Sequence, residues 1–271
     1  MAVPIDSSRH KAMTQVVVTR PEQDASAWVK SLNEAGFKTI RFPLLELSEF
    51  LTAQTALDAL VLLKRSQAVM FVSANAVRFL AHALRHQPDW VEHFQMARAW
   101  CTGPGTAAAL AQSGIPAGQI DQPASQSRQL DSEALWDVVA SQVVHGMHVL
   151  FVRGADESGA TAGRDWLALE LEKAHIKVSA IAAYQRTPTQ LTEAQKVQVQ
   201  QFIADGAIWV FSSSAALQAL VTQCPLANWS MAKATVTHPR MADLAQKMGW
   251  GAVAIAPPGL SSLQASIKSL A

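Results

Sequence analysis

A single tyrosine stands at the end of an apolar, β-type run in the second half of the chain. Tyr184 is the only tyrosine among 271 residues, and Gln185, Arg186 and Thr187 follow it directly. A phenol is a weak acid, and its neighbours bring hydrogen-bond donors to the same strand end, where binding and catalytic side chains tend to gather. We therefore treat Tyr184 as a candidate proton donor. The alternative is a strand-end tyrosine with a buried ring and a solvated hydroxyl.

Small polar residues and glycines also stand where apolar runs give way to alanine-rich segments. A hydroxyl at such a junction can cap a helix, and the N-terminus of a helix favours anions. The residues in these positions are Ser73, Asn75, Gly105, Thr106, Ser212 and Ser214. Arg20 and Arg153 follow two further runs, where a guanidinium can bind a carboxylate in bidentate fashion or pair with an acid of the chain.

Two other patterns suggest different chemistry. GPGTAA at residues 103–108 fits the GxGxxA pattern of dinucleotide-binding loops, with Asp121 downstream. However, this loop does not open the first βαβ unit, so a dinucleotide-binding enzyme is an alternative only. His82 and His86 are four residues apart with no acidic or third ligand near them in sequence, which favours a solvated helix face over a metal site. We expect no metal and no cofactor.

The elements that position these residues alternate between strands and helices. Apolar runs at residues 15–19, 38–42, 68–72, 97–102, 148–152, 176–182, 208–211, 234–237 and 252–256 predict strands. Amphipathic or alanine-rich segments follow most of them, several with a cap residue such as Ser73 or Thr192 at the start. This alternation predicts an α/β fold with parallel sheets and ligands at the carboxyl ends of strands.

Composition excludes several classes of protein. The 22 basic and 21 acidic residues give a net charge of +1, so no overall field attracts nucleic acid or a membrane surface. Two cysteines are too few for a disulfide scaffold, no apolar run is long enough to span a bilayer, and residues 1–13 lack a signal-peptide pattern. We expect a cytoplasmic monomer that acts on a small molecule, with a disordered tail at residues 1–13.

One α/β unit occurs twice in the chain, with its parts in the same order. VVVTRP resembles VLFVRG, VMFVSANAV resembles IWVFSSSAAL, and CTGPGTAAALAQSG resembles VTHPRMADLAQKMG. An extended connector follows the second strand of each copy, at residues 42–48 and 181–188. Two like units suggest two domains facing each other across a cleft, with Tyr184 at one crossing. A non-catalytic, two-lobed binding protein for a small acid would use the same layout.

These motifs together, TRP, FPLLEL, FVSANAV, TGPGTAAAL, VRG and AAYQRT, resemble the uroporphyrinogen-III synthase family from about residue 15 to the C-terminus. The resemblance implies two flavodoxin-like domains joined by a two-stranded linker, with the active site in the cleft between them. It also implies one discontinuous domain, residues 1–43 with 185–271, and a second domain of residues 44–184. The sequence alone would equally allow two contiguous halves.

The resemblance implies a reaction as well. The family converts hydroxymethylbilane, a linear tetrapyrrole with eight carboxylates, by dehydration and ring closure with inversion of the last pyrrole. Closure without the enzyme leaves that ring uninverted, so positioning the chain is the main catalytic contribution. Tyr184 matches the family's tyrosine at this crossing, and we expect it to hydrogen-bond or protonate the departing hydroxyl.

Eight carboxylates on a substrate require many donors from a protein of nearly zero net charge. We expect helix N-termini and strand-end residues to supply them: Arg20, Ser73, Asn75, Gly105, Thr106, Arg153, Ser212 and Ser214. The family often has a threonine at the helix start of the last repeat unit, where this chain has Met241 after His238 and Pro239. Arg240 is the candidate substitute there.

Overall fold

The chain forms two compact units. The computed structural model describes residues 13–124, 127, 130–161, 166–256 and 259–271, so the expected tail lies outside the described residues except for Met13. The first unit combines Met1–Leu45 with Pro188–Ala271, and the second is Glu46–Thr187. The family resemblance implies boundaries at residues 43/44 and 184/185, two to three residues earlier in the chain. One unit is therefore built from both ends of the chain.

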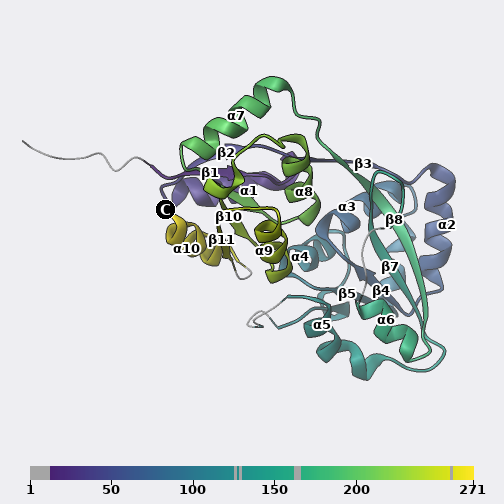
Figure 1. The fold of residues 1–271 in the computed structure, drawn as a ribbon. Coiled ribbons are helices and arrows are strands. Elements are labelled where there is room, and N and C mark those ends of the chain that lie inside the picture. The colour runs from purple at the N-terminus through teal and green to yellow at the C-terminus, as the bar shows by residue number, and fades with distance from the viewer. Residues whose placement is uncertain (1–12, 125–126, 128–129, 162–165, 257–258) are drawn as a thin grey trace, which may run out of the picture. The chain divides into compact units, whose positions relative to one another are not determined.

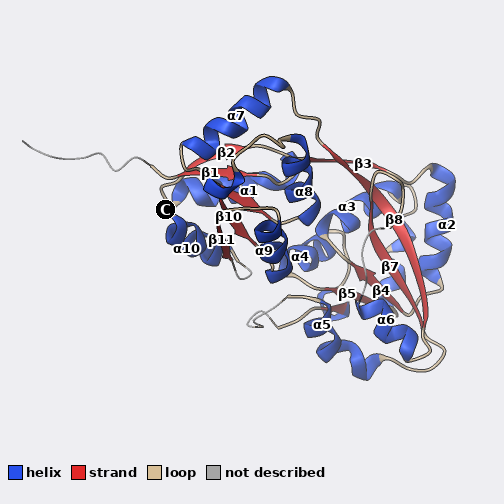
Figure 2. Cartoon of the chain, in the orientation of Figure 1, coloured by secondary structure: helices blue, strands red, loops and turns tan. Residues whose placement is uncertain are grey.

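The first unit is a parallel sheet with helices on both faces (Figures 1 and 2). Its strands lie in the order β11-β10-β9-β1-β2, which is the flavodoxin-like order 2-1-3-4-5 when they are counted along the unit. The strands are β1 (Gln15–Val18), β2 (Lys38–Arg41), β9 (Ile208–Phe211), β10 (Lys233–Val236) and β11 (Ala252–Ile255). The helices are α1 (Glu22–Glu34), α7 (Glu193–Ala204), α8 (Ser214–Gln223), α9 (Pro239–Lys247) and α10 (Leu260–Leu270).

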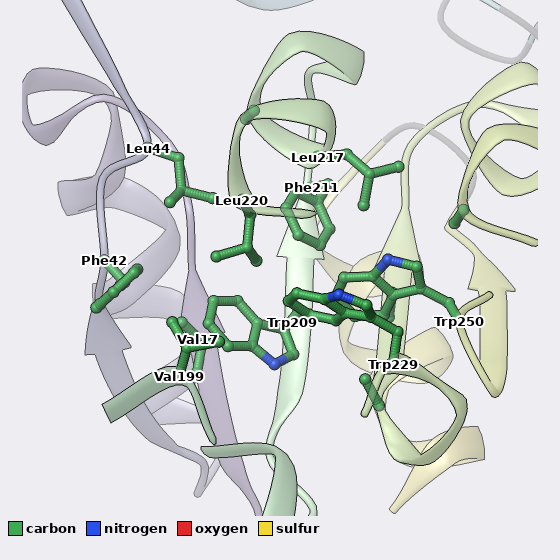
Figure 3. Close-up of a cluster of buried hydrophobic side chains, with 14 of the residues drawn as sticks. Val17, Phe42, Leu44, Val199, Trp209, Phe211, Leu217, Leu220, Trp229 and Trp250 are labelled. Atoms are coloured by element: carbon green, nitrogen blue, oxygen red, sulfur yellow. The ribbon is translucent and has the colours of Figure 1, made fainter. Parts of the chain in front are cut away.

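The sheet of the first unit has a hydrophobic core on each of its two faces, because its inner strands are buried on both sides. Alternate residues of β1 point to opposite faces, so Val17 packs with α7, α8 and α9 while Val16 and Val18 pack with α1 and α10. Aromatic rings fill the first of these cores (Figure 3). The ring of Trp250 meets that of Phe211 edge to face at 5.4 Å and stacks on that of Trp229 at 4.9 Å.

The second unit has a sheet in the order β3-β8-β7-β4-β5-β6. The strands are β3 (Leu45–Glu49), β4 (Ala68–Phe71), β5 (Arg98–Cys101), β6 (Ile120–Asp121), β7 (His148–Ala155) and β8 (Lys177–Pro188). The helices are α2 (Ala53–Lys64), α3 (Ala74–Ala83), α4 (Pro104–Gln112), α5 (Ser132–Val139) and α6 (Trp166–Lys173). Single 3₁₀ turns lie at Pro88–Trp90, Glu92–Gln95, Ala117–Gln119 and Ala140–Gln142, and a fifth, Trp229–Met231, belongs to the first unit.

All nine predicted strands form, and the structure adds β3 and β6. β3 arises from the FPLLEL connector and is hydrogen-bonded to β8, which carries the second connector. Counted by repeat unit, β8-β7-β4-β5-β6 reproduces the order β2-β1-β9-β10-β11 of the first unit. The duplication in the sequence is thus a duplication of sheet topology.

Candidate active site

Tyr184 lies near the carboxyl end of β8 and points into the core of the second unit. Its side chain is buried, with 5% of the residue's surface exposed, in the cluster that packs between the sheet and helices α2, α3 and α4. The ring stacks on Phe79 of α3, with centroids 5.3 Å apart and planes inclined by 21°. Its hydroxyl lies 3.2 Å from the Oγ of Ser73.

Ser73 couples this phenol to the start of a helix. The residue has extended backbone geometry two positions after the end of β4, and its Oγ accepts a hydrogen bond from the N–H of Ala76 at 3.1 Å, so it is the N-cap of α3, as predicted. That bond leaves the Ser73 hydroxyl proton available for the oxygen of Tyr184. The positive end of the α3 dipole therefore adjoins the phenol.

The neighbouring strand brings a second helix start to the same edge of the sheet. β5 pairs with β4 in parallel, so the N-termini of α3 and α4 both lie at the carboxyl edge. Gly103 is the N-cap of α4 and contributes no side chain; Gly105 is exposed and Thr106 is 8% exposed. Asn75 accepts a hydrogen bond from Arg78 at 3.0 Å, which turns its amide toward its own helix.

Arg153 does not join the residues around Tyr184. It lies on β7 with only 8% of its surface exposed, and its guanidinium is 5.2 Å from the centre of the Phe151 ring. Phe151 belongs to the core on the other face of the sheet, with α5 and α6. Side chains two residues apart on a strand share a face, so Arg153 and Tyr184 are on opposite faces.

The predicted residues of the first unit lie at the carboxyl ends of its strands. Ser212 and Ser214 are exposed at the start of α8, and Arg240 is exposed in the first turn of α9. Arg20 follows β1, where its guanidinium lies 4.6 Å from the centre of the Trp28 ring and 3.9 Å from the carboxylate of Asp24. Arg20 thus has an acid of the chain beside it, one of the two outcomes that its position allowed.

Met241 lies buried at the last helix start. Its side chain is 5% exposed within the core of the first unit, and its sulfur lies 4.0 Å from the hydroxyl of Thr237. His238 caps α9 instead, since its Nδ1 accepts from the N–H of Arg240 at 3.1 Å. The helix start keeps a side-chain cap although the threonine of the resembling family is replaced.

The residues behind the alternative chemistries are engaged elsewhere. Asp121, which would bind the ribose of a dinucleotide, is 8% exposed and accepts a hydrogen bond from the Nε of Arg98 at 2.8 Å. Arg98 begins β5, so this pair lies toward the opposite edge of the sheet from the GPGTAA loop. His82 has an acid near it in space although none is near it in sequence: its Nε2 lies 3.0 Å from the carboxylate of Glu49.

The residues that the structure describes form neither a metal-binding cluster nor a nucleophilic cysteine site. Within the described part of the chain, no three His, Cys, Asp or Glu side chains are grouped to hold a metal ion. Burial raises the pKa of the Cys101 thiol to about 11 and also raises the pKa of Cys224, so both remain thiols near neutral pH. Among the helices described, none has the length and apolar character to cross a membrane.

Two residues at the site escaped prediction from the sequence. Phe79 stacks on Tyr184, and Gly154 pairs with it across β7 and β8. Phe79 could have been found, because it lies within the alanine-rich segment after Ser73, one and a half turns into α3. The contact of Gly154 depends on strand register, for which no residue pattern gave a signal.

Comparison with known proteins places this geometry in context. The sequence matches the family model described as "Uroporphyrinogen-III synthase HemD" over residues 26–263. The uroporphyrinogen-III synthase of Chlorobaculum parvum is 27% identical over 195 residues, 72% of either chain. A mutant uroporphyrinogen III synthase from Thermus thermophilus superposes with a TM-score of 0.60 at 15% identity, covering 95% of this chain and 98% of its own. The uroporphyrinogen-III synthetase of Helicobacter pylori superposes with a TM-score of 0.59 at 17% identity, covering 96% of this chain and 100% of its own.

Proposed function

The chain belongs to the uroporphyrinogen-III synthase family, and from this membership we infer that it dehydrates and cyclises hydroxymethylbilane to uroporphyrinogen III. The observation that carries the inference is the family match over residues 26–263, which covers the whole second unit, most of the first unit and both connectors. The shared α/β fold agrees with it. The family's reaction is a lyase-type cyclisation without a cofactor, so the protein's own groups supply the acid and the positioning.

We propose that Tyr184 is the proton donor to the leaving group. The pyrrole nitrogen of the first ring pushes its electron pair toward the carbon that bears the hydroxyl, and the carbon–oxygen bond breaks. The departing oxygen takes the phenolic proton of Tyr184 and leaves as water. The stacking on Phe79 and the hydrogen bond to Ser73 support this role, since a donor held in one orientation loses little entropy in the transition state.

Ser73 stabilises the phenolate that this step creates. Its Oγ lies 3.2 Å from the Tyr184 oxygen and already accepts from Ala76, so its proton points to the phenol when it donates. A hydrogen bond to the charged form is stronger than one to the neutral form. The nearby N-terminus of α3 adds a favourable dipole. We expect the proton to return to Tyr184 once the ring closes.

We propose that helix starts of both units bind the carboxylates of the substrate. Gly103 is the N-cap of α4 and Ser213 is the N-cap of α8, and neither residue makes a side-chain capping hydrogen bond. Backbone N–H groups of the first turns suit a carboxylate, with exposed hydroxyls and guanidinium groups beside them. The residues in this proposal are Arg20, Ser73, Asn75, Gly105, Thr106, Arg153, Ser212, Ser214 and Arg240; Arg153 has the weakest support because it is buried on the face opposite Tyr184.

The decisive experiment separates product isomers. Purified protein is given hydroxymethylbilane, and the type I and type III products are resolved. The wild type is expected to form type III; formation of type I alone, as in buffer, would refute the activity. Tyr184→Phe keeps the ring that stacks on Phe79, so we expect a folded protein whose kcat is lower by about 10²-fold. Full turnover by this variant would remove Tyr184 from the mechanism while leaving the family activity in place.

We also propose that the protein works as a cytoplasmic monomer on this small polyanion, without a nucleic-acid or membrane partner. The net charge of +1 and the two buried free thiols support this view. Light scattering of the eluted protein tests the oligomeric state directly.

A further inference from the structure

The pairing of β7 with β8 shifts by one residue immediately before Tyr184. Along most of the ladder the partners advance together, as far as Arg153 opposite Ala182. The next pair is Gly154 with Tyr184, so Ala183 has no partner on β7. One extra residue on one strand is a β-bulge, a feature that redirects the side chains that follow it.

This bulge decides which face of the sheet receives Tyr184. Val149 and Phe151 of β7 belong to the core beneath α5 and α6, whereas Leu150 and Val152 belong to the core beneath α2, α3 and α4. Regular pairing would set Tyr184 opposite Ala155, on the face of Phe151 and Arg153. The extra residue sets it opposite Gly154 instead, on the face that carries Ser73 and Phe79.

Gly154 is required by the closeness of the ring. A Cβ at this position would lie 2.6 Å from the Cζ of Tyr184, 2.8 Å from its Cε2 and 3.0 Å from its hydroxyl oxygen. Ordinary contact of a Cβ begins at 3.4 Å. Any side chain at residue 154 would therefore push the hydroxyl end of the phenol away from β7, and the atoms it meets are those proposed to carry the proton.

Phe79 contacts the same ring from α3, at 5.3 Å between centroids. The ring of Tyr184 is thus held by a helix residue and by a strand residue, while Ser73 bonds its hydroxyl at 3.2 Å. The ring of Tyr184 cannot move away from a new group at residue 154 without disturbing its stacking on Phe79 or its hydrogen bond to Ser73.

We propose that the bulge at Ala183 and the absence of a side chain at Gly154 are positioning features for the proton donor Tyr184. Gly154 acts through Tyr184 and does not itself touch the substrate. This proposal rests on the proposed function, because it assigns a purpose to the placement of a phenol whose chemical role is inferred there.

The test compares Gly154→Ala with Gly118→Ala. A Cβ at Gly118 would have no heavy atom within 4 Å, so that variant introduces the same methyl group without a contact. In Gly154→Ala the ring must move by about 1 Å, and a displacement of this size at a reacting group costs up to about 10²-fold in rate. We expect kcat to fall toward that of Tyr184→Phe with KM changed less than about twofold, and Gly118→Ala to match the wild type.

Two further readouts make the role of Gly154 specific. Because Tyr184 is the only tyrosine, ¹³C-tyrosine labelling gives ring NMR signals from this residue alone. We expect these signals to move in Gly154→Ala and to stay in Gly118→Ala. In the Tyr184→Phe background, Gly154→Ala should have little further effect on kcat, because the hydroxyl whose position it controls is gone. If Gly154→Ala does not fold, Phe79→Leu replaces it, and the tyrosine signals and kcat should both change.

The results separate the two proposals. Unmoved tyrosine signals in a folded Gly154→Ala protein overturn the positioning role whatever the activity. Moved signals with wild-type kcat overturn it as well, provided that Tyr184→Phe is impaired. If Tyr184→Phe is fully active, the proton-donor role fails and takes the purpose of the positioning with it, whereas the NMR signals still decide whether Gly154 sets the place of the ring.

Discussion

Replacing Ser73 by alanine removes two hydrogen bonds with different consequences. The Oγ of Ser73 accepts from the N–H of Ala76 at 3.1 Å and bonds to the hydroxyl of Tyr184 at 3.2 Å. The first bond stabilises the start of α3, and the second is proposed to support the proton donor. We expect the variant to lose both stability and turnover, each through its own bond.

The expected loss of stability follows from these contacts. A lost N-cap costs about 1 kcal/mol. Losing the partner of a buried Tyr184 hydroxyl costs about 1 kcal/mol more, for a total of about 2 kcal/mol in Ser73→Ala. Removing one hydrogen bond to the developing phenolate, worth about 1.4 kcal/mol, lowers kcat by about tenfold.

Asp131→Ala is the matched control. Asp131 caps α5 in the same unit through a bond of 3.0 Å from the N–H of Ala134, and α5 packs on the face of the sheet opposite Tyr184. Its loss should cost about 1 kcal/mol and leave kcat unchanged. Urea unfolding and turnover of both variants, with Tyr184→Phe and the double variant, complete the comparison.

Two results would contradict this reasoning. Equal kcat values for Ser73→Ala and Asp131→Ala would show that the bond to Tyr184 does nothing in turnover. Additive effects of Ser73→Ala and Tyr184→Phe on kcat would show that the two hydroxyls act separately, because a shared function predicts that the second substitution adds little to the first.

Two further predictions concern stability. Burial, with a smaller effect of the Lys177 charge, lowers the pKa of His148 below 6.5, so as the pH falls the unfolded chain takes up this proton before the folded protein does. The free energy of unfolding should therefore be level above about pH 6.5 and decrease below it, down to the pKa of His148 in the folded protein. Urea midpoints measured from pH 7.5 to 5 test this, and His148→Gln should reduce the decrease. Gly251→Ala would bring a Cβ to 1.9 Å from the carbonyl oxygen of Ser230, so it should destabilise the first unit by about 1–3 kcal/mol in urea unfolding. Gly118→Ala, whose Cβ meets nothing within 4 Å, should not. An unchanged urea midpoint in Gly251→Ala would contradict the close approach.

Local patterns predicted most of the elements. The runs at β4 and β9 are buried on both faces, which is why uninterrupted apolar residues indicated strands there. Thr192 was predicted to begin a helix, and its Oγ1 does accept from the N–H of Gln195 at the start of α7. The duplicated unit in the sequence corresponds to one strand order shared by the two sheets.

The arrangement around Tyr184 was less predictable because it depends on contacts between distant residues. Ser73 and Tyr184 were each predicted as site residues, but their contact across 111 positions follows only from the order of β4, β7 and β8. A bulge inserts one residue and leaves composition unchanged, so the alternation of side chains gave no sign of it. The assignment of carboxylate-binding residues stays a prediction, and for Arg153 the burial beside Phe151 weakens it.

The discontinuous unit also sets an order for folding during synthesis. β1 is an interior strand of its sheet and pairs with the central strand β9, Val16 opposite Ile208, so it is made long before this neighbour. The contiguous unit, Glu46–Thr187, can close its own core while the ribosome is still translating the rest. Until β9 is synthesised, the apolar residues Val16, Val17 and Val18 of β1 cannot pair with it, so one side of β1 has exposed backbone hydrogen-bonding groups like the edge strand of a sheet. Nascent chains stalled before residue 208 should therefore recruit chaperones through this first strand.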